Sequence, residues 1–158
     1  MRVLAIDPGY DRLGVAVMEL QGTETVLFST CIETDRSTTM PERLQHIGTE
    51  IEKVITQYQP DTVALETLFF NKNIKTAIAV AQARGVLLYL AKQAGCTVYE
   101  FGPQEIKVAT TGYGASNKMA VQQMLQRLVH NIPKSALDDE YDAIAVGVTC
   151  LAHYGRTS

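Results

Sequence analysis

Short apolar runs separated by turn residues occupy the first fifth of the chain. The runs are Val3–Asp7, Leu13–Leu20 and Thr25–Ile32, and the turn signals between them are Pro8-Gly9 and Gln21-Gly22-Thr23. Apolar runs of this length, bounded by Gly and Pro, are typical of strands, and short connections join antiparallel neighbours. The pattern therefore predicts an antiparallel meander of three strands.

The apolar spacing then becomes helical, and two further strands follow. Residues recurring every three or four positions predict an amphipathic helix that starts at a cap at Thr39 or Met40 and ends before Pro60; they are Leu44, Ile47, Ile51, Val54 and Ile55. Strands are expected over 61–67 and 96–101, on either side of a helix over 74–94 that Gly95 ends. This order predicts that strands four and five run parallel to strand one, in an α/β fold.

Helices are expected over most of the remaining chain. They cover 103–110, 117–130 with Ser116 as the N-terminal cap, and 138–152. A flexible loop over 111–114 separates the first two of these helices. We find no internal repeat, low-complexity tract or linker, so the chain is expected to form a single domain over residues 1–158.

Two acidic residues stand where predicted strands end. Asp7 follows the first apolar run, and Glu66 follows Val63-Ala64-Leu65 within a stretch that continues apolar through Phe70. If the two strands are neighbours, the acids lie roughly 5 Å apart at one edge of the sheet, where open α/β sheets bind ligands. Taken alone, Asp7 before Pro-Gly is also an ordinary turn former. Glu66 is harder to explain without a partner, because an ionised acid in apolar surroundings is costly.

A second pair of acids begins the last predicted helix. Asp139 and Asp142 are three residues apart and share a face near its N-terminus. Asp138 is four residues from Asp142 and could share that face instead, and an acidic helix start is common by itself. Several carboxylates in one cleft need a neutralising cation, and oxygen ligands favour Mg²⁺ or Mn²⁺. Two such ions could activate water for phosphodiester hydrolysis.

The combination of motifs resembles the RuvC family of bacterial Holliday junction resolvases. The matching segments cover nearly the whole chain in order and are Ala5-Ile6-Asp7-Pro8-Gly9 with Gly14, Leu65-Glu66 with Phe69, Gln82-Ala83-Arg84-Gly85, and Asp139-x-x-Asp142-Ala143. The resemblance implies a ribonuclease-H-like fold with a five-stranded mixed sheet flanked by helices. It also implies a homodimeric, Mg²⁺-dependent endonuclease that nicks opposed strands of a four-way junction, and a partnership with the RuvA–RuvB branch-migration complex.

The resemblance also assigns residues to roles. The metal ligands would be Asp7, Glu66, Asp139 and Asp142, which would hold Mg²⁺, or Mn²⁺ in its place, as two ions when DNA is bound. Phe69 would approach the unstacked bases of the junction, although the adjacent Phe70 is a second candidate. Lys107 and Lys118 would contact DNA, and further basic candidates are Lys72, Lys75 and Arg84.

The charge distribution agrees with a nucleic-acid enzyme despite a formal net charge of -3. Residues 1–66 hold five basic and eleven acidic side chains, whereas residues 67–137 hold eight basic and two acidic ones. A basic segment of this kind could supply the phosphate contacts that dominate nucleic-acid affinity. A scattered solvated surface would give the same counts.

The helix expected over 74–94 is apolar on more than one face. One face can cover the sheet, and the other suggests either a two-fold partner or full burial within the monomer. The three cysteines are far apart and fit neither a disulfide framework nor a zinc site. No apolar run reaches the roughly 18 residues of a membrane span or forms a secretory signal, so a cytoplasmic location is expected.

Three other functions fit parts of the sequence. An actin-like or sugar-kinase ATPase also opens with an Asp-x-Gly turn but needs two such domains to enclose a nucleotide. A single-domain ribonuclease of the same fold could act on structured RNA. A non-catalytic junction-binding module would have no use for four acids at one site.

Overall fold

Five strands form one mixed sheet in the computed structural model, which describes residues 1–67 and 74–155. The strands are β1 (Arg2–Asp7), β2 (Arg12–Gln21), β3 (Thr23–Glu33), β4 (Thr62–Glu66) and β5 (Thr97–Phe101). Their order across the sheet is β3-β2-β1-β4-β5. β1 pairs antiparallel with β2 and parallel with β4, and β5 extends the sheet parallel to β4. The predicted meander and the predicted parallel strands are both confirmed.

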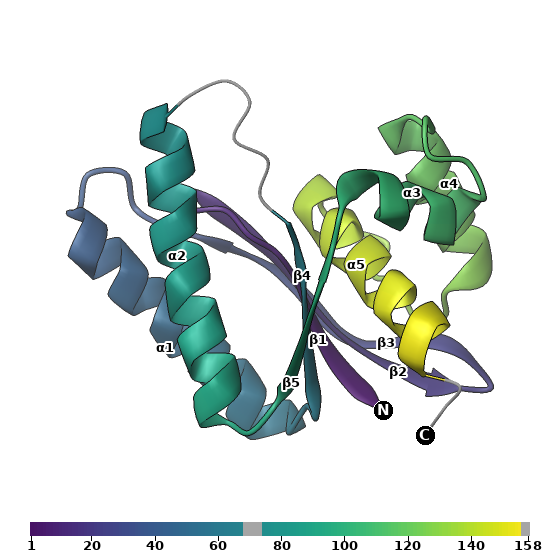
Figure 1. Ribbon diagram of the computed structural model, residues 1–158, viewed down its shortest axis with the longest axis horizontal. Coiled ribbons are helices and arrows are strands. Elements are labelled where there is room, and N and C mark those ends of the chain that lie inside the picture. Colours follow the sequence, from purple (N-terminus) through teal and green to yellow (C-terminus); the bar gives the residue numbers. More distant parts are fainter. Residues whose placement is uncertain (68–73, 156–158) are drawn as a thin grey trace.

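Helices cover both faces of this sheet (Figure 1). They are α1 (Met40–Tyr58), α2 (Ile74–Gln93), α3 (Pro103–Thr111), α4 (Lys118–Leu128) and α5 (Asp138–Tyr154). α1 and α2 lie on one face, and α5 lies on the other with α3 and α4 beside it (Figure 1). Within residues 1–67 and 74–155, no helix is long and apolar enough to cross a membrane.

The central strand β1 has a core on each side because its side chains alternate between the two faces. Val3 and Ala5 belong to the core shared with α5, whereas Leu4 and Ile6 belong to the core shared with α1 and α2. All four side chains are fully or almost fully buried. This double burial explains why the run reads as continuously apolar in the sequence.

Helix α5 lies close to the sheet because small residues line the contact. A Cβ atom at Gly14 of β2 would overlap the carbonyl oxygen of Asp139, and one at Gly147 of α5 would overlap the sulfur of Met18. Gly14 is also the residue of β2 that pairs with Asp7. The close approach therefore brings the first turn of α5 to the end of β1.

Several helix ends follow the sequence, and one cap was predicted wrongly. Thr39 precedes α1, and its backbone N–H donates to the side chain of Glu42 at 2.8 Å. Gly95 has a φ of 77°, a left-handed conformation that suits the chain reversal after α2. The cap of α4 is Asn117, not Ser116, because the Asn117 side chain accepts the Ala120 N–H at 2.9 Å. The Ser116 hydroxyl instead donates to the Tyr113 carbonyl.

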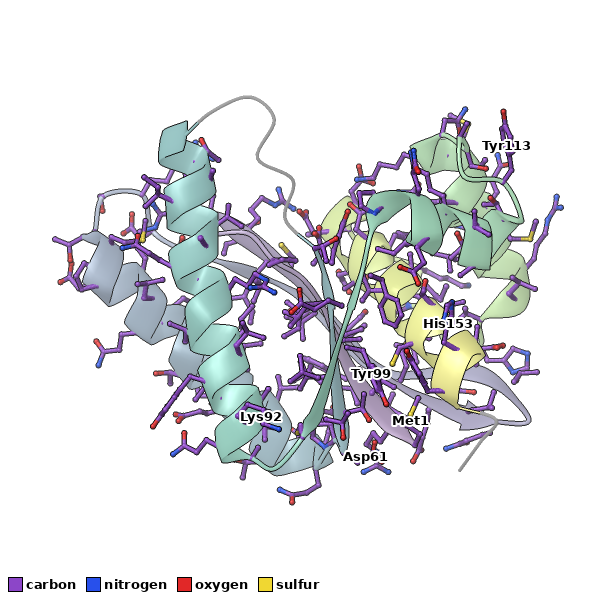
Figure 2. The ribbon with its side chains drawn as sticks, in the orientation of Figure 1. Met1, Asp61, Lys92, Tyr99, Tyr113 and His153 are labelled. Carbon is purple, nitrogen blue, oxygen red and sulfur yellow. The ribbon has the colours of Figure 1, made fainter. Side chains whose placement is uncertain are left out.

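Two of the C-terminal helices end at other positions than predicted. α4 stops at Leu128, two residues before the expected end. The reason is that His130 joins the sheet edge, donating its N–H to Glu24 and accepting the N–H of Val26. α5 in turn continues to Tyr154, whose ring stacks on Tyr99 of β5 at 3.9 Å between centroids. Tyr99 and His153, which precedes Tyr154, lie near each other at this contact (Figure 2).

Candidate active site

Asp7 and Glu66 meet at the carboxyl edge of the sheet. Each is the last residue of its strand, and the parallel register of β1 and β4 sets Ile6 opposite Leu65, immediately before the two acids. The Asp7 carboxyl, when protonated, donates a hydrogen bond to Glu66. The predicted adjacency of these two acids is therefore present in the structure.

Asp139 and Asp142 approach the same edge from α5. Their negative charges both act on Asp7, and that of Asp142 also acts on Glu66. Asp138 lies elsewhere on the helix surface, with its side chain 71% exposed and accepting a hydrogen bond from Gln122 at 3.0 Å. The structure thus brings Asp139, rather than Asp138, to the other acids.

Burial and mutual repulsion change the protonation of the two strand acids. The pKa of Asp7 rises from 3.8 to about 7, first because the carboxyl is buried and then because Glu66, Asp142 and Asp139 are negatively charged. The pKa of Glu66 is also raised, by burial and then by Asp142. A site that retains protons for lack of positive charge favours a bound cation.

Cationic side chains of the protein pair with Asp139 and with Asp142. Lys118 Nζ lies 2.8 Å from Asp142 Oδ2, and Arg12 Nη2 lies 2.7 Å from Asp139 Oδ2. Partial burial lowers the pKa of Lys118, but the hydrogen bonds and charges of Asp142 and Asp138 outweigh it, so the net pKa is raised. Lys118 therefore stays charged at neutral pH.

A cleft of about 250 Å³ opens beside these groups, between α3, α4, α5 and the end of β4. It is lined by two acids and two lysines over an apolar floor; they are Glu66, Asp142, Lys107 and Lys118, with Pro103, Ile106, Val121 and Ala145. The positive charge of Lys107 acts on Glu66. A larger groove of about 480 Å³ lies between β3 and α1 but includes none of the four acids.

The four acids fit a divalent metal ion in donor type but are not gathered around one point. Carboxylate oxygens are the ligands that Mg²⁺ and Mn²⁺ prefer. Among the residues that the structure describes, no three His, Cys, Asp or Glu side chains form a ready metal cage. The ion pairs of Asp139 with Arg12 and of Asp142 with Lys118 hold these two carboxylates toward protein cations instead of toward a common metal position. Bound metal would have to compete with these two cations.

Other DNA-binding candidates are only partly covered by the structure. Phe69, Phe70 and Lys72 lie outside the described residues, and the side chain of Lys75 does too. Arg84 of α2 forms an ion pair with Glu100 of β5, and its side chain is 23% exposed. Its charge is thus engaged within the protein.

Arg12 was not among the site residues predicted from the sequence. This residue begins β2, two positions before the glycine that pairs with Asp7. That offset places it at the carboxyl edge of the sheet, which was the available signal. Its partner Asp139, however, is 127 positions further along the chain, and only the packing of α5 on β2 brings the two side chains together.

Comparison with known proteins identifies a family with this architecture. Residues 3–150 match the family described as crossover junction endodeoxyribonuclease RuvC. The RuvC protein of Heliobacterium modesticaldum is 43% identical over 153 residues, which cover 95% of this chain and 93% of that protein. A Thermus thermophilus RuvC structure superposes with a TM-score of 0.87 at 30% identity, covering 99% of this chain and 96% of the other.

A second Thermus thermophilus structure holds RuvC in complex with a Holliday junction substrate. It superposes with a TM-score of 0.89 at 28% identity, covering 97% of this chain and 94% of that one. The fold is thus that of the ribonuclease-H-like resolvases, as predicted. RuvC nucleases are metal-dependent. Matched along nearly its whole length, the chain belongs to the RuvC family of crossover junction endodeoxyribonucleases.

Proposed function

We propose that this protein resolves Holliday junctions in recombination and repair by metal-dependent hydrolysis of two opposed DNA strands. The observation that carries the proposal is the meeting of Asp7 and Glu66 with the acids of α5, beside a cleft lined by Lys107 and Lys118. Acids bind metal, lysines bind phosphate, and a phosphodiester needs both at one place. Family membership selects four-way junction DNA as the substrate.

The metal ligands of this proposal are Asp7, Glu66, Asp139 and Asp142, with two Mg²⁺ ions when DNA is bound and Mn²⁺ as a substitute. The ions would activate water for attack and stabilise the leaving oxygen of the phosphodiester. The role of the chain is to provide ionised oxygens. Asp7 must lose the proton it holds against Glu66, and Asp139 and Asp142 must exchange their protein cations.

Lys107 and Lys118 would hold backbone phosphates along the cleft. Lys118 is half-exposed, so a phosphate can reach it as metal takes its place beside Asp142. Phe69 would contact the unstacked bases, with Lys72, Lys75 and Arg84 as further basic contacts. For Arg84, a DNA contact would require release of its ion pair with Glu100.

The protein would act as a homodimer through α2. One face of this helix is buried against the sheet by Ala83, Leu87 and Ala91. Ile78 and Tyr89, eleven residues apart and thus on one side of the helix, are 56% and 66% exposed. A second, outward apolar face suits a two-fold partner. We further propose that one domain spans residues 1–158, works with RuvA–RuvB, and acts in the cytoplasm, where its DNA substrate is found.

The test is cleavage of a synthetic four-way junction in Mg²⁺. We expect Asp7→Asn and Asp139→Asn to lower the cleavage rate about a hundredfold or more, as expected when a group that organises transition-state charge is lost, while junction binding is retained. Asp138→Asn is the matched control, because its side chain faces solvent on the same helix turn. Substantial cutting by Asp7→Asn would remove Asp7 from the site.

Substrate class is tested with the unaltered protein. Four-way junction, plain duplex and structured RNA of equal length are compared under the same conditions. Preferential cutting of the junction supports the proposal. A preference for RNA would favour the ribonuclease alternative, and binding without cutting would favour the non-catalytic module.

A further inference from the structure

Arg12 connects the start of β2 to an acid of the candidate active site. Its guanidinium Nη2 lies 2.7 Å from Asp139 Oδ2, and its Nη1 lies 3.8 Å from Glu33 Oε1. The same guanidinium also donates toward the sulfur of Cys31 on β3. Arg12 is therefore fixed from the sheet side while it holds Asp139 on α5.

The backbone of β2 favours the contact between Arg12 and Asp139. Gly14, two residues along β2, lets the carbonyl of Asp139 approach the strand at a distance that no side chain would permit. Residues two apart on a strand lie on the same face, so Arg12 extends from the same side that Gly14 leaves open. The pairing with Asp139 thus follows from the way α5 sits on β2.

Arg12 is also accessible from solvent. Its side chain is 44% exposed, whereas that of Asp139 is 25% exposed. An anion arriving at this edge of the sheet can therefore reach the guanidinium. The guanidinium fork matches phosphate oxygens as well as carboxylate oxygens.

We propose that Arg12 is a positioning residue that occupies Asp139 in the DNA-free protein and releases it when a DNA phosphate takes over the guanidinium. This inference rests on the proposed function, because it needs Asp139 to be a metal ligand. Metal binding and DNA binding then reinforce each other. A metal ion that binds Asp139 frees Arg12 for a DNA phosphate, and a DNA phosphate that binds Arg12 frees Asp139 for the metal. Asp139 thus becomes fully available as a metal ligand only when DNA is present.

The first test measures Mn²⁺ affinity without DNA, from the electron paramagnetic resonance signal of the free ion. Arg12→Gln should bind Mn²⁺ about threefold to fivefold more tightly than the unaltered protein, as expected for the loss of a partly exposed ion pair. Arg12→Lys retains the charge and should restore most of the original affinity. The matched control is Arg36→Gln, which removes a 3.0 Å ion pair with Asp11 outside the site and should leave affinity unchanged.

A double-mutant cycle shows whether Asp139 transmits the effect. In the Asp139→Asn background, Arg12→Gln should give no further gain in Mn²⁺ affinity.

A second readout is junction binding in a metal chelator. Arg12→Gln should reduce the slope of log affinity against log salt by about 0.9, which corresponds to the loss of one phosphate contact.

Unchanged or weaker Mn²⁺ binding by Arg12→Gln would overturn the inference, as would an equal gain in the Asp139→Asn background. Its failure is distinguishable from failure of the proposed function through Asp7→Asn. If Asp7→Asn loses Mn²⁺ binding while Arg12→Gln has no effect, the metal site stands and only the role of Arg12 is wrong. If the unaltered protein binds no Mn²⁺ with or without DNA, both proposals fail.

Discussion

Asp7 shows at the scale of one residue how burial and neighbouring charge alter an ordinary carboxyl. The apolar run before it, together with the parallel neighbour that ends in Glu66, made its position predictable from the sequence. Its protonation was not predictable, because the pKa is raised first by burial and then by the charges of Glu66, Asp142 and Asp139, and the last two are contributed by the last helix. The same limit hid Arg12, whose partner is known only once α5 is placed.

The raised pKa of Asp7 predicts how the metal-free protein responds to pH. The folded protein retains a proton that the unfolded chain loses above pH 3.8, so unfolding releases it and stability falls as pH rises from about 4 to about 7. The fall is on the order of 4 kcal/mol for a pKa rise of this size. We expect urea unfolding in a metal chelator to show it, and Asp7→Asn to abolish most of it.

Asp138→Asn serves as the control for this measurement. The pKa of Asp138 is lowered, by the hydrogen bond from Gln122 and then by Lys118, so its contribution to stability is constant above about pH 4 and is lost only as pH falls below that value. The variant should therefore retain the fall between pH 4 and pH 7. A fall of equal size in Asp7→Asn would mean that another group carries the proton.

Helix α5 illustrates at the scale of an element what a sequence pattern cannot specify. Its existence and its acidic start were predicted, but its height above the sheet was not. That height is set by Gly14 and Gly147, where strand and helix approach each other without side chains between them. The site depends on this approach, because Asp139 reaches Asp7 and Arg12 only if the first turn of α5 stays close to β2.

Gly14→Ala should therefore disturb the site as well as the fold. The added methyl group meets the backbone of Asp139, which cannot move aside as a flexible side chain could. We expect a loss of about 1–3 kcal/mol in the free energy of unfolding, the usual cost of overpacking, together with weaker Mn²⁺ binding.

Gly147→Ala provides the comparison, because Gly147 lies in the middle of α5 and not in its first turn. Its added methyl group crowds the side chain of Met18 on β2. It should lower stability and leave Mn²⁺ affinity near that of the unaltered protein at a temperature where both are folded. Equal loss of metal affinity in the two variants would show that Gly14 acts through stability alone.

The two-sided apolar character of α2 belongs to the scale of the whole molecule. The sequence indicated two apolar faces but left open whether both are buried within one chain. In the described part of the chain, one face packs into the core and the other exposes Ile78 and Tyr89. Full burial within the monomer is thereby excluded for these two side chains.

Tyr89→Glu should convert the proposed dimer into monomers. A charge at the centre of an apolar interface is costly to bury, so sedimentation equilibrium should show a shift to the mass of one chain, with weaker junction binding. Tyr113→Glu is the matched control, because Tyr113 is 67% exposed on the loop between α3 and α4. A dimer that survives Tyr89→Glu would move the interface elsewhere.

The sheet was predictable because β1 and β4 are apolar on both faces and the connections are short or helical. The net charge of -3 was uninformative, since acids and bases occupy different segments. The predictions that were wrong concerned one N-terminal cap and the ends of two helices. Ser116 and Asn117 are both good N-terminal caps, and only the position of Ala120 decides between them. The end of α4 was set by the contacts of His130 with β3, far away in sequence.

The direction of β1 has a practical consequence for handling the protein. The strand begins beside Asp61, whose carboxylate accepts the backbone N–H of Arg2, and it ends at Asp7. Met1 and Asp61 lie together at the amino ends of β1 and β4 (Figure 2), roughly 17 Å of strand away from the acids. An affinity tag or surface tether joined at Met1 would therefore leave the edge that carries the acids open, so under the proposed function immobilised protein should still engage a junction.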